Sequence, residues 1–152
     1  MVSTLIFVMG SIGFFTIHNV NAATQTVIFI SPISELTWDS NQQNNYINDD
    51  MNLISQYPDE IGHGQILNGT YDTVMIRPIV NTLDQTINIK LFYNGSPTNI
   101  SFRINPGDYN TKIINVNFPF NKGDNLIWVF NGRSNTANSL KFDAQVIIDY
   151  TK

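Results

Sequence analysis

An Asn94-Gly95 pair constrains the fold of this chain more than any other feature of the sequence. Residues 86–93 before the pair alternate apolar and polar side chains, and residues 99–104 after it do the same. A period of two is typical of a half-buried strand. Asn and Gly tolerate the positive φ values that a tight turn between two strands requires. The stretch therefore predicts a β-hairpin. The inward face of its first strand consists of Ile87, Ile89, Leu91 and Tyr93.

Other alternating segments extend the same pattern over most of the chain. Strands are predicted at residues 26–30, 51–55, 71–80, 111–118, 126–130 and 140–150. Pro78 removes a backbone donor, so the strand that contains it is expected at a sheet edge or at a bulge. The sequence shows no helix of convincing length, no internal repeat and no heptad. About eight antiparallel strands separated by turns predict an all-β fold, a single β-sandwich or jelly roll.

Length and charge limit the classes of function. A chain of 152 residues is long enough for one domain with its own core. Charged residues make up 13% of it and the net charge is −4, with no basic cluster, so a nucleic-acid partner is not expected. The absence of cysteine excludes disulfides, thiolate metal sites and a cysteine nucleophile.

The first 22 residues predict export. An uncharged apolar run at residues 5–17 precedes Val20 and Ala22, which fit the recognition positions of a secretory signal cleaved after Ala22. The first Lys or Arg is Arg77, so the usual positive start of a signal is missing. An uncleaved membrane anchor is one alternative, although the run is shorter than the roughly 20 residues of a membrane span. A segment packed inside an assembly is another. The β-sandwich domain is expected at residues 23–152, outside the cell or on a cell or virion surface.

Catalysis and metal binding have little support in the sequence. His63, the only histidine after the predicted signal, stands between two glycines and has no nucleophile motif to accompany it, so we expect a non-enzymatic protein. Calcium is the one metal that the sequence allows, because Asp39, Asp49 and Asp50 could supply oxygen ligands. Their spacing matches no defined calcium loop, and a solvated acidic loop is the simpler interpretation.

Three aromatic residues are candidates for stacking against a sugar. Trp38 and Tyr46 lie in the polar stretch 38–52, which is predicted as a long loop, and Tyr109 follows the turn at residues 105–108. Their rings combine an apolar face with a polar edge, as a carbohydrate platform requires. Trp38 could equally cover the end of the sandwich. Trp128 lies in an apolar run and is expected in the core.

Three sequons mark candidate glycosylation sites at Asn68, Asn94 and Asn99. Asn68 and Asn94 fall in predicted turns, which makes them sterically accessible. Pro97 directly follows the sequon of Asn94 and is expected to hinder modification there. Asn99 opens a predicted strand.

Residues 87–104 and 120–129 resemble the C1q/TNF-like jelly-roll modules of bacterial and viral surface fibres. Those modules run from a strand through Asn-Gly to a second strand, and later through a Gly-Asp turn into the penultimate strand. The resemblance spans about residues 86–130 and implies a compact jelly roll that assembles, often as a trimer. A hydrophobic segment joined to a small sandwich is also similar to subunits of archaeal surface filaments.

Together these features predict an exported structural or adhesive subunit of a surface or virion assembly. Its partners would be other copies of itself or other surface proteins, with a membrane involved only if residues 1–22 are retained. Strand edges are the expected contacts, above all the segment Thr26, Val27, Ile28, Phe29 and Ile30. The alternative is a secreted carbohydrate- or ligand-binding module that uses Trp38, Tyr46 and Tyr109.

Overall fold

The computed structural model describes residues 4–8, 14–19, 24–38, 43–51, 54–55, 64–65, 67–132 and 138–151. Within these ranges the chain forms strands and turns. The strands are β1 (Thr4–Val8), β2 (Phe14–Asn19), β3 (Thr24–Trp38), β4 (Asn44–Asn48), β5 (Ile54–Ser55), β6 (Asn68–Asn81), β7 (Ile87–Tyr93), β8 (Ser96–Ile104), β9 (Lys112–Phe120), β10 (Leu126–Asn131) and β11 (Asn138–Thr151).

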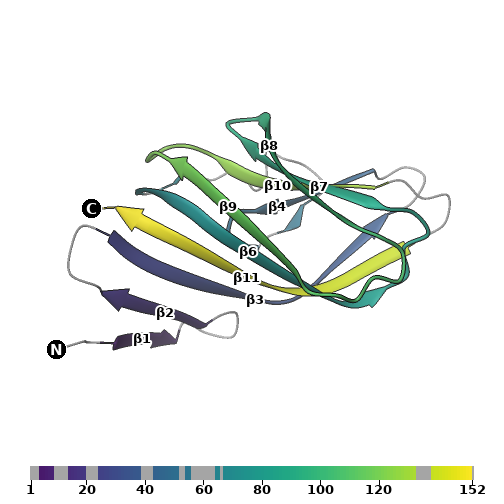
Figure 1. The fold of residues 1–152 in the computed structure, drawn as a ribbon, viewed down its shortest axis with the longest axis horizontal. Helices are drawn as coiled ribbons and strands as arrows, with labels where there is room; N and C mark the ends of the chain where they lie inside the picture. Colours follow the sequence, from purple (N-terminus) through teal and green to yellow (C-terminus); the bar gives the residue numbers. More distant parts are fainter. Residues whose placement is uncertain are drawn as a thin grey trace.

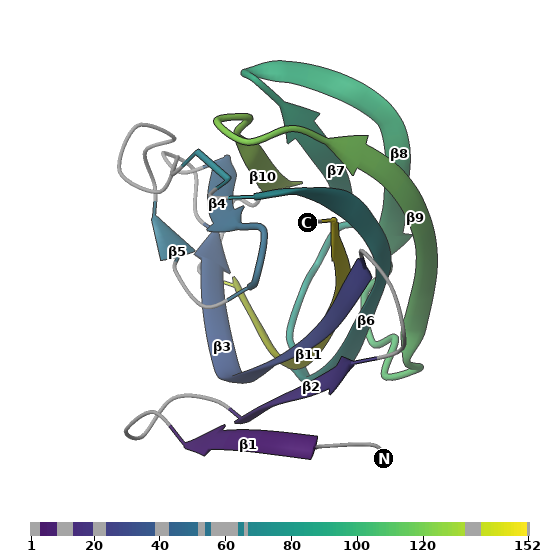
Figure 2. The ribbon, with the colours of Figure 1, turned by 90° about the vertical axis from the view of Figure 1, so that its left-hand side faces the viewer.

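The strands form two antiparallel sheets that pack against each other (Figure 1). One sheet has six strands in the order β1-β2-β3-β11-β6-β9, and the other has five in the order β5-β4-β10-β7-β8. In Figure 2 the β1–β2 hairpin lies along β3, on the side of the molecule away from β7 and β8. The predicted all-β sandwich is confirmed. In the part of the chain that the structure describes, no helix is long and apolar enough to span a membrane.

The core lies between the sheets and is built by alternation. Trp128 and Phe130 of β10 and Phe142 of β11 are fully buried, and Phe130 stacks on Phe142 with ring centroids 5.6 Å apart. Trp128 also meets Phe102 of β8 edge-on, with a centroid separation of 5.8 Å. The inward residues predicted for the hairpin follow the same pattern, because Ile87, Ile89 and Leu91 are buried and Tyr93 packs against this core.

The predicted hairpin at Asn94-Gly95 is confirmed. Both residues have positive φ, 48° for Asn94 and 78° for Gly95, as a tight turn between antiparallel strands requires. β7 and β8 pair from Tyr93 with Ser96 to Ile87 with Ile104, with a shift of register between Lys90 and Phe92. β8 therefore begins at Ser96, three residues before the predicted start.

Bulges accommodate two of the prolines, which corrects the predicted end of the strand at residues 26–30 and confirms the bulge predicted as one of two alternatives at Pro78. β3 continues past Ser31 and ends at Trp38. Ala144 pairs with Ser31, and Phe142 pairs with Ser34. Two residues of β3, Pro32 and Ile33, therefore lie opposite the single residue Asp143 of β11, which is a bulge. Pro78 lies at a second shift, where Lys141 pairs with Val80 and Phe142 with Pro78. β6 is thus an interior strand with a bulge, not an edge strand.

The stretch 38–52 is not one long loop, as the sequence predicted. β4 occupies Asn44–Asn48 and pairs along its whole length with β10, which places polar Asn and Tyr side chains on a sheet surface. The predicted strand at residues 51–55 is reduced to β5, two residues long. β1 and β2 also lie in the region interpreted from sequence as a signal or anchor, where they form a hairpin.

Candidate functional site

The segment predicted for self-association lies in the first half of β3. On one side, β11 pairs with β3 along nearly its whole length, from Thr24 to Trp38. On the other side, β2 pairs only with Gln25–Phe29. We call the side of residues 25–29 that faces β2 the β3 edge. Without the hairpin, this stretch of backbone would form the border of the sheet.

The side chains of this segment are divided between the two faces of the sheet. Val27 is buried, and Phe29 packs against the core. Thr26 donates a hydrogen bond to the carboxylate of Asp149 on β11, at 2.5 Å. Ile28 and Ile30 point to the outer face, and 46% of Ile30 is exposed. The segment is therefore apolar on both faces, and its outer face is open to solvent at Ile30.

Ile30 belongs to an apolar row across the outer face of the six-stranded sheet. Gln145 pairs with both Ile30 and Met75, and Met75 pairs with Ile113, so these four side chains lie next to one another on β3, β11, β6 and β9. Ile113 is 64% exposed. A hollow of about 490 Å³ lies over Ile30 and Met75 and reaches the ion pair between Arg77 and Asp143. We call this surface the aliphatic face.

Trp38 does not present its ring to a ligand. It ends β3 on the inward side, and only 1% of its surface is exposed. It belongs to the main core cluster, together with Leu36 of the same strand. The expectation of a solvent-facing stacking platform at Trp38 was wrong, because the residue ends a strand instead of lying in a polar loop. The alternative prediction, that Trp38 covers the end of the sandwich, agrees better with its buried position.

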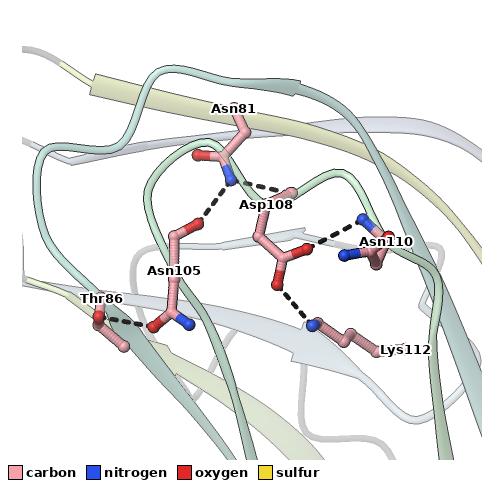
Figure 3. A network of polar contacts seen from close by, with 6 residues as sticks. All are labelled: Asn81, Thr86, Asn105, Asp108, Asn110 and Lys112. Carbon is pink, nitrogen blue, oxygen red and sulfur yellow. Dashed lines mark hydrogen bonds and ion pairs between the residues drawn. The ribbon is translucent and has the colours of Figure 1, made fainter.

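Tyr109 is 55% exposed on the turn between β8 and β9. A polar network holds this turn (Figure 3), in which the buried Asn81 donates to the carbonyl oxygens of Asn105 at 2.8 Å and Asp108 at 3.0 Å. Lys112 donates to the carboxylate of Asp108 at 2.5 Å, and this hydrogen bond is the largest cause of the lowered pKa of Asp108. The turn is therefore fixed, and the hydroxyl of Tyr109 reaches the carbonyl oxygen of Asn81 at 3.5 Å.

Tyr46 lies on β4 and faces outward from the five-stranded sheet. Together with Phe92 of β7, it packs against a small apolar cluster formed by Ile127 and Val129 of β10. Phe92 was not predicted as a candidate, although the alternation of β7 places it on the face opposite Ile87. Of the three predicted stacking residues, the structure places Tyr46 in a ring-lined hollow, Tyr109 on the turn between β8 and β9 and Trp38 in the core.

The three sequon asparagines are all exposed. Asn94 uses its side chain inside the hairpin, where it donates to Asp124 at 2.9 Å and accepts from the backbone of Asn125 at 2.7 Å. Asn68 accepts from the backbone of Lys122 at 2.8 Å. Asn99 lies on β8. A glycan on Asn94 would have to replace two hydrogen bonds, so the structure makes Asn94 the least suited of the three.

The end of β4 connects to the core through Asp49. Its carboxylate accepts a hydrogen bond from Gln65 at 2.7 Å, and its carbonyl accepts one from the hydroxyl of Tyr71. The indole of Trp128 in turn donates to the Tyr71 hydroxyl at 3.0 Å. Burial raises the pKa of Asp49 from its ordinary 3.8 to about 6, with a smaller contribution from the charge of Asp50 and an opposing one from Gln65.

The calcium hypothesis gains no support from this region. Among the described residues, no group of three or more His, Cys, Asp or Glu side chains is placed to hold a metal ion. Asp39, the third candidate ligand, and His63 lie outside the described residues.

Comparison with known proteins does not identify a family. No family model matches the chain, and no curated protein matches it. Among solved structures, the chain is similar to one described as the crystal structure of FLHE, at 13% identity and a TM-score of 0.40. The match covers 86% of this chain and 100% of that one.

Proposed function

We propose that this chain is an exported, non-enzymatic structural or adhesive subunit of a cell-surface or virion assembly, and that it self-associates through the β3 edge. The observation that supports this most is the pairing of β2 with residues 25–29 of β3. Cleavage after Ala22 removes β2, which leaves those backbone N–H and C=O groups without partners. An edge of this kind is a template for a strand from another chain.

The aliphatic face adds a second reason. Ile28 and Ile147 are cross-strand neighbours on its surface, and Ile30 lies two residues further along β3. A copy that pairs at the β3 edge covers apolar area beside the edge as well as forming backbone hydrogen bonds. Burial of apolar surface contributes about 25 cal/mol for each Å², so such contacts favour association.

The proposal is tested by comparing chains 1–152 and 23–152 by size-exclusion chromatography with light scattering. We expect residues 23–152 to form oligomers and the full chain to form fewer, because the hairpin covers the edge. A charge at the centre of the edge should block pairing, so Ile28→Lys in the 23–152 chain is expected to be monomeric. Ile147→Lys is the matched control, since Ile147 is the neighbour of Ile28 one strand further from the edge.

Two results would contradict the assignment to an edge. One is a monomeric 23–152 chain at high concentration. The other is an equal loss of oligomers in Ile28→Lys and Ile147→Lys, which would move the contact from the edge to the outer face.

Export has its own test, the intact mass of protein purified from its native source. A chain that begins at Ala23 supports cleavage, and a chain that retains Met1 overturns it.

A further inference from the structure

The outer face of the five-stranded sheet differs from every other surface that the structure describes. Along β4, β10 and β7, its outward side chains are amides, two aromatic rings, a lysine, a valine and an isoleucine. We call this surface the amide face, and the residues that line its hollow are Asn44, Tyr46, Asn88, Lys90, Phe92, Val129 and Asn131. The hollow has a volume of about 360 Å³.

Three asparagines form a row across the sheet at one end of the hollow. Asn131 of β10 pairs with Asn44 of β4 on one side and with Asn88 of β7 on the other. The Asn131 amide donates to the Asn44 side-chain oxygen at 2.6 Å. Neighbouring strands lie about 4.8 Å apart, so the row extends over about 10 Å. The row continues to Arg103 on β8, which pairs with Asn88.

An apolar floor with two rings lies beside this row. Val129 is 8% exposed and pairs with Tyr46, and Ile127 is 7% exposed and pairs with Phe92. The rings of Tyr46 and Phe92 come from the two strands that flank β10 and pack on these aliphatic side chains. The site thus offers ring faces and hydrogen-bonding amides side by side, within a hollow of the size that small-molecule sites have, about 300–1,000 Å³.

The chemistry of these groups selects one class of ligand. A side-chain amide both donates and accepts hydrogen bonds, as the hydroxyl groups of a sugar do. An aromatic ring presents an apolar face that a sugar's C–H groups can cover. An apolar protein surface would bury the Asn88 amide, and the groups of Asn44 and Asn131 that their mutual hydrogen bond leaves open, without partners, which costs about 1–3 kcal/mol for each group. A nucleic acid requires a basic surface, whereas this chain carries a net charge of −4.

We propose that the amide face is a binding site for a short oligosaccharide, which lies across β4, β10 and β7 with its rings on Tyr46 and Phe92 and its hydroxyl groups on the asparagine row. Lys90 pairs with Val129 on the side opposite Tyr46 and lies between Phe92 and Asn88 along β7, where its ammonium group can donate to a further hydroxyl or to a sugar carboxylate. The site lies on the sheet opposite the β3 edge, so it does not depend on the assembly proposed above.

The test uses the protein produced in a host that does not glycosylate it, so that Asn99 on β8 carries no glycan of its own. The protein is applied to an array of neutral and uronic-acid-containing di- to tetrasaccharides, and the strongest ligand is measured by isothermal titration calorimetry. We expect Tyr46→Ala to weaken binding by about tenfold, which corresponds to about 1.4 kcal/mol, because the variant removes an aromatic ring contact. Asn88→Ala, at an exposed position, is expected to weaken it by severalfold without changing the melting temperature.

Two control variants make the result specific. Tyr46→Phe keeps the ring and should retain most of the affinity. Tyr109→Ala removes the exposed tyrosine on the β8–β9 turn, outside the amide face, and should leave binding unchanged. Binding that persists in both Tyr46→Ala and Asn88→Ala, or that is lost in Tyr109→Ala, would place the ligand elsewhere and overturn the assignment. The absence of binding to every sugar on the array at millimolar concentration would overturn the proposal itself.

Discussion

Corresponding rows on the two outer faces of this sandwich differ sharply in chemistry. The row on the aliphatic face contains Ile30, Met75 and Ile113 around Gln145, whereas the row on the amide face is made of asparagines. Both rows lie on antiparallel strands whose opposite sides build the same core. An exposed aliphatic side chain is stabilised when another apolar surface covers it, while an exposed amide is already satisfied by water. The first face is therefore suited to a protein contact and the second to a hydroxyl-rich ligand.

This difference shows where the fold and the function are encoded. Alternate residues of each strand face inward and determine the sandwich, and those side chains are similar in the two sheets. The residues between them face outward, make little contribution to the core, and are free to differ. If the two faces are independent in this way, substitution of an inward-facing residue should disturb both faces. Substitution of an outward-facing residue should disturb only the face on which it lies.

The largest effect is expected from Trp128→Ala. Trp128 is fully buried, meets the Phe102 ring and donates to the Tyr71 hydroxyl, so its removal leaves a cavity and takes one of the two hydrogen bonds of that hydroxyl. We expect a loss of about 3–5 kcal/mol in the free energy of unfolding. Val129→Ala, the next residue along β10 and on the amide face, should cost about 1.5 kcal/mol. Urea unfolding at neutral pH measures both. Equal losses of unfolding free energy in the two variants would contradict the assignment of Trp128 to the inward side of β10 and of Val129 to its outward side.

A smaller effect of opposite sign is expected from Asp49→Asn. Asp49 directly follows β4, and its carbonyl oxygen accepts from the hydroxyl of Tyr71 on the other sheet, so it links the two sheets. Because its pKa is about 6 in the folded state and 3.8 ordinarily, the folded protein binds a proton that the unfolded chain has released between these values. The contribution of Asp49 to stability is therefore greatest below about pH 4 and falls as the pH rises to about 6.

The asparagine variant carries no charge and retains an oxygen that can accept from Gln65. At pH 7.5 we expect it to be more stable than the wild type by about 1–3 kcal/mol, and at pH 3 to be equal to it. Urea unfolding at the two pH values provides the measurement. A variant that is less stable than the wild type at pH 7.5 would show that the ionised carboxylate is favourable in its site.

Alternation and turn chemistry were sufficient to predict the core and most of the strands. The positive φ of Asn94 and the burial of Trp128 both follow from local signals in the sequence. Pro78 indicated an edge or a bulge, but the bulge at Pro32 was not predicted, because a bulge depends on the partner strand that accommodates the extra residue. β4 was missed because its outward residues are asparagines and a tyrosine, which are also typical of a loop.

The candidate surfaces were predicted only in part. Sequence reasoning found Tyr46 and Ile30 but not their neighbours, since cross-strand rows join residues far apart in the chain. The pairing of Asn131 with both Asn44 and Asn88 requires the register of three strands. The outward position of Phe92 could be predicted from the alternation of β7. That Phe92 and Tyr46 pack on the same β10 cluster could not be predicted without the strand register.

The smallest effect on stability, and the sharpest test of the comparison, comes from exchanging the chemistry of the two faces. Ile30→Asn places an amide on the aliphatic face, and Asn88→Ile places an aliphatic side chain on the amide face. Both positions are exposed and at neither does the side chain fill the core, so each variant should change the free energy of unfolding by less than about 0.5 kcal/mol. Thermal unfolding provides this control.

The two variants should differ in function although they do not differ in stability. If Ile30 supports self-association beside the β3 edge, Ile30→Asn weakens oligomers of the 23–152 chain in light scattering and leaves sugar binding as it was. If the asparagine row holds hydroxyl groups, Asn88→Ile weakens sugar binding in calorimetry and leaves the oligomers as they were. Loss of both properties in either variant would mean that the faces are coupled through the core, and the contrast between them would then have no functional meaning.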